Sequence, residues 1–185
     1  MIRPIIIATL LALCATAAFA QEAAPDHTLE CHDNGLHYVI GIPAADGGTS
    51  YRVGDFTGPD QTNPCSMDAP FTREFIAEDG NQLYFQAISD DLLVLAESTG
   101  PQYFLEVYNL EPSGPILKAD AQDVEISEFG IHYYAPAGPA TPQTCPRYDE
   151  LTAGGMGAII GEERFYAFTT ASVEPGKGTR CYQTP

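Results

Sequence analysis

Recognised catalytic signatures are missing from this chain. It contains no G-x-S-x-G elbow, S-x-x-K pair, H-E-x-x-H helix or phosphate-binding loop. C-x-x-C is also absent, which argues against a thioredoxin-like dithiol and against covalently attached haem. We therefore expect a non-enzymatic protein with no catalytic residues and no cofactor. A carboxylate-based hydrolase, which needs only two suitably placed Asp or Glu side chains, remains an alternative.

Basic side chains are scarce. The chain has 8 Lys and Arg residues against 25 Asp and Glu residues, and its formal net charge is −17. Residues 21–144 hold 20 acidic and three basic side chains, whereas residues 145–185 hold five and four. This balance excludes nucleic-acid binding, which depends on Lys and Arg to neutralise phosphates. An acidic surface instead attracts a cationic protein or a divalent ion, and it also helps to keep a monomer soluble.

Long apolar runs are lacking except at the start of the chain. Residues 1–20 combine Arg3 with an apolar stretch and end in Ala18-Phe19-Ala20, which fits the small-x-small rule for signal-peptide cleavage. The stretch is shorter than the roughly 20 residues that a membrane helix needs. We therefore expect a signal peptide over 1–20 and one secreted or periplasmic domain over 21–185, with no membrane segment after cleavage. No N-x-Ser/Thr sequon is present, which favours a bacterial periplasm or medium.

Four cysteines remain once Cys14 has left with the signal peptide. An even number of cysteines in an exported protein indicates disulfides. Pairing Cys31 with Cys65 and Cys145 with Cys181 closes two loops of similar length, one near each end of the chain. We expect this connectivity among the three that are possible.

Short apolar segments separated by Gly, Pro and Asp predict an all-β fold of antiparallel strands. Residues 82–128 read as a meander, with turns at Asp90-Asp91, at 99–101 and at 112–115. We expect a single-domain sandwich or barrel. A small propeller is the alternative, because four strands of this meander resemble one blade. Further hairpins are predicted to turn at 161–163 and 175–178, and one helical turn is predicted near Tyr148–Leu151.

Two histidines flank the turn dipeptide Asn34-Gly35. If these two residues are the centre of a type I′ turn, then His32 lies directly opposite His37 on the polar face of a hairpin. Glu30 lies diagonally on the same face, and the three side chains could share a zinc or copper ion. A periplasmic metal-binding protein is therefore the second functional hypothesis. The competing interpretation is a solvated histidine pair, whose replacement would change stability by less than about 0.5 kcal/mol.

The first functional hypothesis is a monomeric, acidic binding module for a cationic partner. It combines the charge imbalance with the missing catalytic signatures, and the sequence does not show which residues bind.

Overall fold

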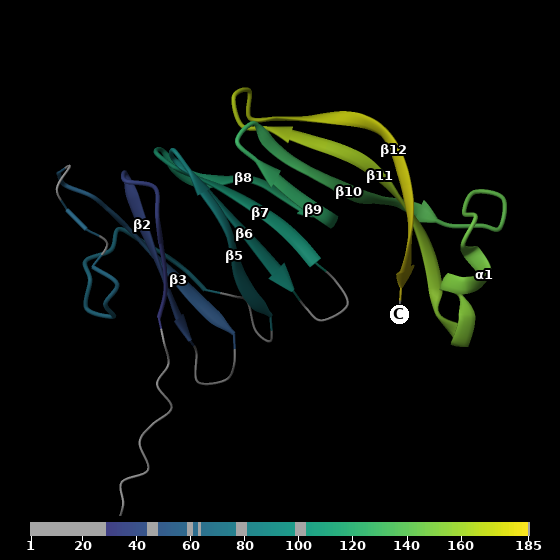
Figure 1. Ribbon diagram of the computed structural model, residues 1–185, viewed down its shortest axis with the longest axis horizontal. Helices are drawn as coiled ribbons and strands as arrows, with labels where there is room; N and C mark the ends of the chain where they lie inside the picture. The colour runs from purple at the N-terminus through teal and green to yellow at the C-terminus, as the bar shows by residue number, and fades with distance from the viewer. Residues whose placement is uncertain are drawn as a thin grey trace, which may run out of the picture.

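The computed structural model describes residues 29–43, 48–58, 61–62, 64–76, 81–98 and 103–184. The predicted signal peptide, residues 1–20, lies outside these ranges. The described residues form three antiparallel sheets of four strands each (Figure 1). The all-β prediction is therefore confirmed.

Each sheet uses a continuous part of the chain. The first contains β1 (Glu30–Asp33), β2 (His37–Pro43), β3 (Thr49–Asp55) and β4 (Arg73–Phe75). The second contains β5 (Gln82–Ser89), β6 (Leu92–Ser98), β7 (Tyr103–Leu110) and β8 (Ser113–Asp120). The third contains β9 (Gln122–Ser127), β10 (Gly130–Pro139), β11 (Gly157–Ala167) and β12 (Ser172–Thr184). The strands of the predicted meander are confirmed for β5 to β8, whereas β9 opens the third sheet. Its predicted turn at 99–101 lies outside the described residues, and its last turn lies at Glu111-Pro112 and not at 112–115.

The second sheet is the middle layer of a stack (Figure 1). Side chains alternate across a strand, so neighbouring residues of β6 face opposite layers. Leu93 and Leu95 pack with Val53 of the first sheet, and Val94 packs with Ile131 of the third. All five side chains are fully buried. The apolar run in β6 thus serves two cores, and the architecture is a sandwich extended by a third sheet.

Both predicted disulfides are present. Cys31 pairs with Cys65 across 5.7 Å between Cα atoms, and Cys145 pairs with Cys181 across 6.0 Å. Two disulfides indicate an oxidising, non-cytoplasmic environment. Among the described residues, none of the helices has the length and apolar character required to cross a membrane.

The C-terminal hairpins differ from the prediction. β11 and β12 are continuous strands joined at 168–171, so residues 161–163 and 175–178 do not turn the chain. The glycines that suggested turns instead permit close packing. A Cβ atom on Gly161 would lie 2.7 Å from the Tyr182 ring, closer than real contacts allow. The predicted helical turn is confirmed as α1 (Tyr148–Leu151), which a 3-10 turn (Ala153–Gly155) follows.

Candidate functional site

The turn that separates the two predicted metal ligands is centred one residue later than expected. Asp33 pairs with Tyr38 and His32 with Val39, so His32 does not lie opposite His37. Gly35 adopts a φ of 83°, which suits the first central position of a turn.

The Asn34 side chain fixes this turn. Its Oδ1 accepts hydrogen bonds from the N–H groups of Leu36 (3.0 Å) and His37 (2.9 Å). This local bonding of Asn to the following backbone competes with a turn centred on Asn34 itself. The change of register leaves His32 and His37 on the same face, but not directly opposite each other.

The structure does not bring Glu30, His32 and His37 together. His32 Nε2 lies 2.7 Å from Glu30 Oε1, and the His32 ring stacks on Phe85 with centroids 3.7 Å apart. His37 binds other partners and is only 5% exposed. In the described part of the chain, no group of three or more His, Cys, Asp and Glu side chains is arranged to hold a metal ion.

The expectation that both histidines lie on a solvent face is therefore wrong. That face of the first sheet packs against the second sheet, with Val39 and Val53 in the shared core. The opposite face is covered as well, because Tyr38 is buried and its hydroxyl donates to the Pro70 carbonyl. The local sequence of the hairpin does not indicate that a second sheet packs against it.

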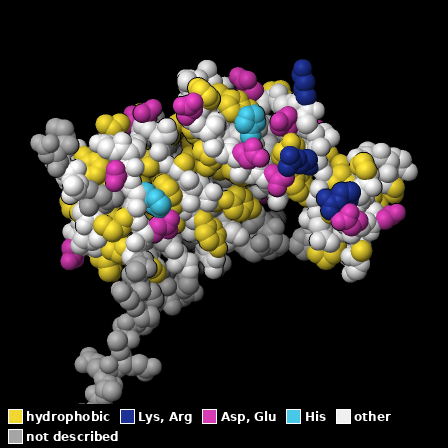
Figure 2. Space-filling view, viewed as in Figure 1, with side chains coloured by type: hydrophobic (Ala, Val, Ile, Leu, Met, Phe, Trp, Pro, Cys, Tyr) yellow, Lys and Arg dark blue, Asp and Glu magenta, His cyan; other side chains and the backbone are white. Residues whose placement is uncertain are grey.

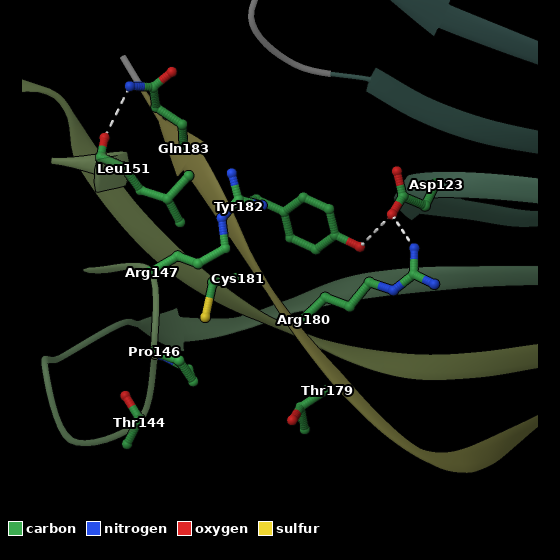
Figure 3. Close-up of a pocket in the computed structure, with 10 residues that line it drawn as sticks. All are labelled: Asp123, Thr144, Pro146, Arg147, Leu151, Thr179, Arg180, Cys181, Tyr182 and Gln183. Carbon is green, nitrogen blue, oxygen red and sulfur yellow. Dashed lines mark hydrogen bonds and ion pairs between the residues drawn. The ribbon is translucent and has the colours of Figure 1, made fainter. Parts of the chain in front are cut away.

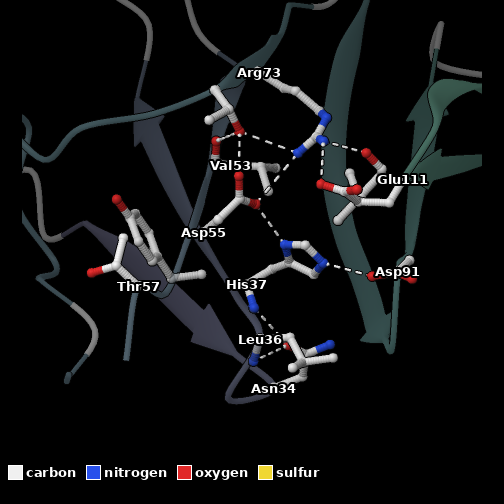
Figure 4. A network of polar contacts seen from close by, with 12 residues as sticks. Asn34, Leu36, His37, Val53, Asp55, Thr57, Arg73, Asp91 and Glu111 are labelled. Carbon is white, nitrogen blue, oxygen red and sulfur yellow. Dashed lines mark hydrogen bonds and ion pairs between the residues drawn. The ribbon is translucent and has the colours of Figure 1, made fainter. Parts of the chain in front are cut away.

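His37 contacts one carboxylate of its own sheet and one at the edge of the second sheet, and so joins the first two sheets (Figure 4). Its Nδ1 lies 2.7 Å from Asp55 Oδ1, and its Nε2 lies 3.0 Å from Asp91 Oδ1. Asp55 belongs to β3, whereas Asp91 lies in the turn between β5 and β6. Arg73 reinforces the contact, with Nη1 3.5 Å from Asp55 Oδ1 and Nη2 3.8 Å from Glu111 Oε1. This network is a polar clasp between two layers.

The clasp predicts how stability depends on pH. Burial alone would raise the pKa of Asp55, but the hydrogen bond from His37 and the charge of Arg73 outweigh it and hold the pKa below its ordinary value. The ionised carboxylate therefore contributes stability above its unfolded pKa of about 3.9, and that contribution is lost as pH falls through the lower folded value. We expect Asp55→Asn to flatten the loss of thermal stability below about pH 4 relative to the wild type. Unfolding midpoints across that range test this, and identical slopes would contradict it.

A second polar cluster lies in a pocket of about 250 Å³ beside the core of the first two sheets. Glu97 and Glu106 are 3% and 6% exposed and share Lys118, whose Nζ lies 2.8 Å and 2.6 Å from their carboxylate oxygens. Asn81 donates to Glu97 (2.6 Å) and Tyr108 donates to Glu106 (2.6 Å). Both buried carboxylates are thus provided with partners.

The electrostatics of this cluster favour a structural role. Burial by itself would raise the pKa of Glu97. The hydrogen bonds from Lys118 and Asn81 outweigh this effect, so the pKa lies below its ordinary value. The hydrogen bonds to Glu106 and Glu97 raise the pKa of Lys118. A general acid needs a carboxyl group whose pKa is raised, so that it keeps its proton at neutral pH. Glu97 is therefore unsuited to the acid role that a carboxylate-based hydrolase requires.

The outer face of the third sheet carries exposed polar and aromatic groups. Glu174 pairs with Phe165, Phe165 with His132, and His132 with Glu125, so these four residues form one row across all four strands. We call this set the acidic row. The His132 and Phe165 rings lie 4.5 Å apart between the two glutamates. Acidic side chains and a histidine gather over this part of the third sheet in Figure 2.

A larger pocket, of about 860 Å³, lies between the same sheet and the segment that contains α1 (Figure 3). We call it the C-terminal pocket. Its lining comes from β12, from the start of β9 and from the segment 144–151, and comprises Asp123, Thr144, Pro146, Arg147, Leu151, Thr179, Arg180, Cys181, Tyr182 and Gln183. The Lys and Arg side chains visible in Figure 2 lie over the third sheet and the neighbouring α1 segment.

Sequence reasoning named none of the residues of the acidic row or the C-terminal pocket as a site. The alternation in Asp123-Val124-Glu125-Ile126 does indicate which side chains of that strand point away from the core. Their partners on β11 and β12 could not be found, because the predicted turns at 161–163 and 175–178 interrupt both strands.

Comparison of the chain with protein-family models, with curated protein sequences and with solved structures finds no match in any of the three.

Proposed function

We propose that this protein is a non-enzymatic binding module, periplasmic or secreted, that holds basic side chains of a cationic partner protein on the acidic row. The observation that carries the proposal is the arrangement of the row itself, in which two exposed glutamates flank an aromatic pair.

The row offers a Lys or Arg side chain two kinds of contact. Glu125 and Glu174 lie on the two edge strands of the sheet, so each carboxylate can form a charge-assisted hydrogen bond with a different basic side chain of the partner. The face of the Phe165 ring attracts a cation through its quadrupole and packs against the aliphatic part of the side chain. Phe129, which is 66% exposed in the turn between β9 and β10, extends the apolar area at this end of the sheet.

Glu163 keeps a further negative charge beside the row. Its Oε2 accepts hydrogen bonds from the backbone N–H groups of Gly178 (2.9 Å) and Lys177 (3.0 Å). These bonds hold the pKa of Glu163 below its ordinary value. Its Oε1 lies 3.9 Å from His132 Nδ1, so Glu163 borders the aromatic pair. The carboxylate is thus ionised and held in place at neutral pH.

The charge of the whole chain supports the same type of partner. Six of the basic side chains in the described residues already lie within ion-pair distance of a carboxylate: Arg52, Arg73, Lys118, Arg147, Arg164 and Arg180. Their charges are compensated locally, and the excess of the 25 acidic residues is left to act on the surroundings. A net charge of −17 steers cationic proteins toward the surface and repels polyanions.

A pair of double variants tests the proposal. Glu125→Gln with Glu174→Gln should weaken binding of a Lys- and Arg-rich peptide by about thirtyfold, because each of the two lost charged contacts is worth about 1 kcal/mol. Asp33→Asn with Asp68→Asn removes the same charge from exposed positions elsewhere and should weaken it by less than about threefold, through the long-range field alone. Calorimetric titration at low and physiological salt measures both.

Salt separates this mechanism from an apolar one. Above physiological ionic strength the Debye length falls below about 8 Å, so affinity for the basic peptide should fall steeply. Equal losses in the two double variants, or undiminished binding in molar salt, would refute a role for the acidic row.

A further inference from the structure

We infer that the C-terminal pocket binds an uncharged oligosaccharide, with one sugar ring lying on Tyr182. This site goes beyond the proposed function, because its lining contains none of the acidic-row residues and it takes a ligand of a different class.

The pocket is built in advance of any ligand. Its two walls are β12 and the segment 144–151, and the Cys145–Cys181 disulfide joins them covalently. Gln183 Nε2 adds a hydrogen bond to the Leu151 carbonyl oxygen at 2.8 Å. Its volume of about 860 Å³ falls within the range of small-molecule sites, roughly 300 to 1,000 Å³. Rigid walls reduce the ordering that binding would otherwise require.

Tyr182 provides a fixed aromatic surface. Its ring lies against Gly161, where even a Cβ atom would approach Cε2 to 2.7 Å, so the ring rests closely on the sheet. Its hydroxyl donates to Asp123 Oδ2 at 3.1 Å, which sets the rotation of the ring. The side chain is only partly buried and lines the pocket. A partly exposed aromatic ring held in this way suits the apolar C–H face of a sugar ring.

Asp123 and Arg180 supply acceptor and donor groups beside that ring (Figure 3). Arg180 Nη1 lies 2.5 Å from Asp123 Oδ2, and the Arg180 guanidinium stacks over the Tyr134 ring at 4.7 Å. The two side chains are 46% and 52% exposed, so both remain accessible. A carboxylate next to a planar guanidinium presents several acceptors and donors in fixed directions. Adjacent sugar hydroxyls, each both donor and acceptor, match such a pair.

The charges of the site favour a neutral ligand. Each guanidinium is already matched by one carboxylate, Arg180 by Asp123 and Arg147 by Glu150 (2.6 Å). An anionic ligand would have to displace one of these carboxylates and would also meet the repulsion of a chain with net charge −17. A cationic ligand would face two arginines. An uncharged, hydroxyl-rich ligand meets neither obstacle.

Affinity electrophoresis tests this inference. The exported protein is run in native gels that contain soluble starch, hydroxyethyl cellulose, glycol chitin or, as the anionic contrast, alginate. We expect retardation by at least one of the three neutral polymers and none by alginate. The corresponding hexasaccharide is then titrated while tyrosine fluorescence is followed, which is convenient because the chain has no tryptophan.

Three variants locate the site. Tyr182→Ala should weaken binding by at least about tenfold, as for removal of a binding hot spot, and Asp123→Ala should weaken it as well. Phe129→Ala removes an exposed aromatic ring at the opposite end of the sheet and should bind as the wild type does. Circular dichroism checks that each variant is folded. If Tyr182→Ala does not fold, the saccharide binding of Asp123→Ala tests the site instead.

The inference fails if no neutral polymer retards the wild type, if alginate is the stronger ligand, or if folded Tyr182→Ala and Asp123→Ala variants bind like the wild type. The Glu125→Gln, Glu174→Gln double variant should keep full saccharide binding, so this site and the acidic row can fail independently.

Discussion

Replacing Lys118 by methionine should lower the free energy of unfolding by about 2 to 4 kcal/mol. The substitution leaves Glu97 and Glu106 buried without the ammonium group that lies within 2.8 Å of both. Removing one partner of a buried ion pair costs about 3 to 5 kcal/mol. We expect somewhat less here because the Lys118 side chain is 52% exposed and water can partly replace it. Denaturant unfolding at neutral pH measures the change.

Two comparisons show whether the loss comes from the carboxylates. Lys177→Met removes an exposed lysine of β12 and should change the free energy of unfolding by less than about 0.5 kcal/mol. Adding Glu97→Gln to Lys118→Met should recover part of the loss, because one buried charge fewer remains. The deficit of Lys118→Met should also shrink toward pH 4, where the stranded carboxylates take up protons more readily than in the unfolded chain. A deficit that matches that of Lys177→Met would contradict the structural role of this cluster.

Replacing His37 by alanine should cost about 1.5 to 3 kcal/mol, whereas replacing His32 should cost about 1 kcal/mol or less. His37 is buried and contacts Asp55 and Asp91, and hydrogen bonds to charged groups contribute about 1.5 to 3 kcal/mol. His32 loses its stacking on Phe85 and a partly exposed contact with Glu30. Both substitutions remove the same imidazole ring, so the difference between their costs reflects only the position of the histidine in the fold.

Chemical unfolding of both single variants distinguishes this result from the interpretation based on the sequence, which expects less than about 0.5 kcal/mol for both replacements together. If His37→Ala and His32→Ala are equally mild, the polar clasp between the first and second sheets does not stabilise the fold.

Features that depend on residues close in the chain were predictable. The strands of the second sheet follow from apolar segments of suitable length between turn residues, and an even number of cysteines at matched spacings predicted both disulfides. These inferences use local sequence and chain length alone. They require no knowledge of which sheet faces which.

Register was the first quantity that the sequence did not determine. The turn predicted at 112–115 would pair Glu106 with Ala121, whereas the observed turn at Glu111-Pro112 and an irregularity near Tyr108 pair Glu106 with Lys118. A shift by an odd number of residues exchanges the two faces of a strand. The buried cluster of Glu97, Glu106 and Lys118 therefore could not be predicted from the sequence, even though its members lie on neighbouring strands.

Contacts between sheets were the second such quantity. Asp91 reaches His37 across 54 positions of sequence, and no periodicity within either segment indicates that they meet. The same holds for Asp123, which meets Arg180 and Tyr182 across 57 and 59 positions. Polar side chains at turns and strand ends are common, so their types alone do not single out these partners.

The positions of the two disulfides have a mechanical consequence. Each bridge closes a loop within one terminal sheet, and neither joins one layer of the stack to the next. Tension applied between the two ends of the folded chain would therefore be carried across the layers by noncovalent contacts, among them the His37 clasp between the first two sheets. The middle sheet can be drawn out to its full contour length while the loops 31–65 and 145–181 stay closed.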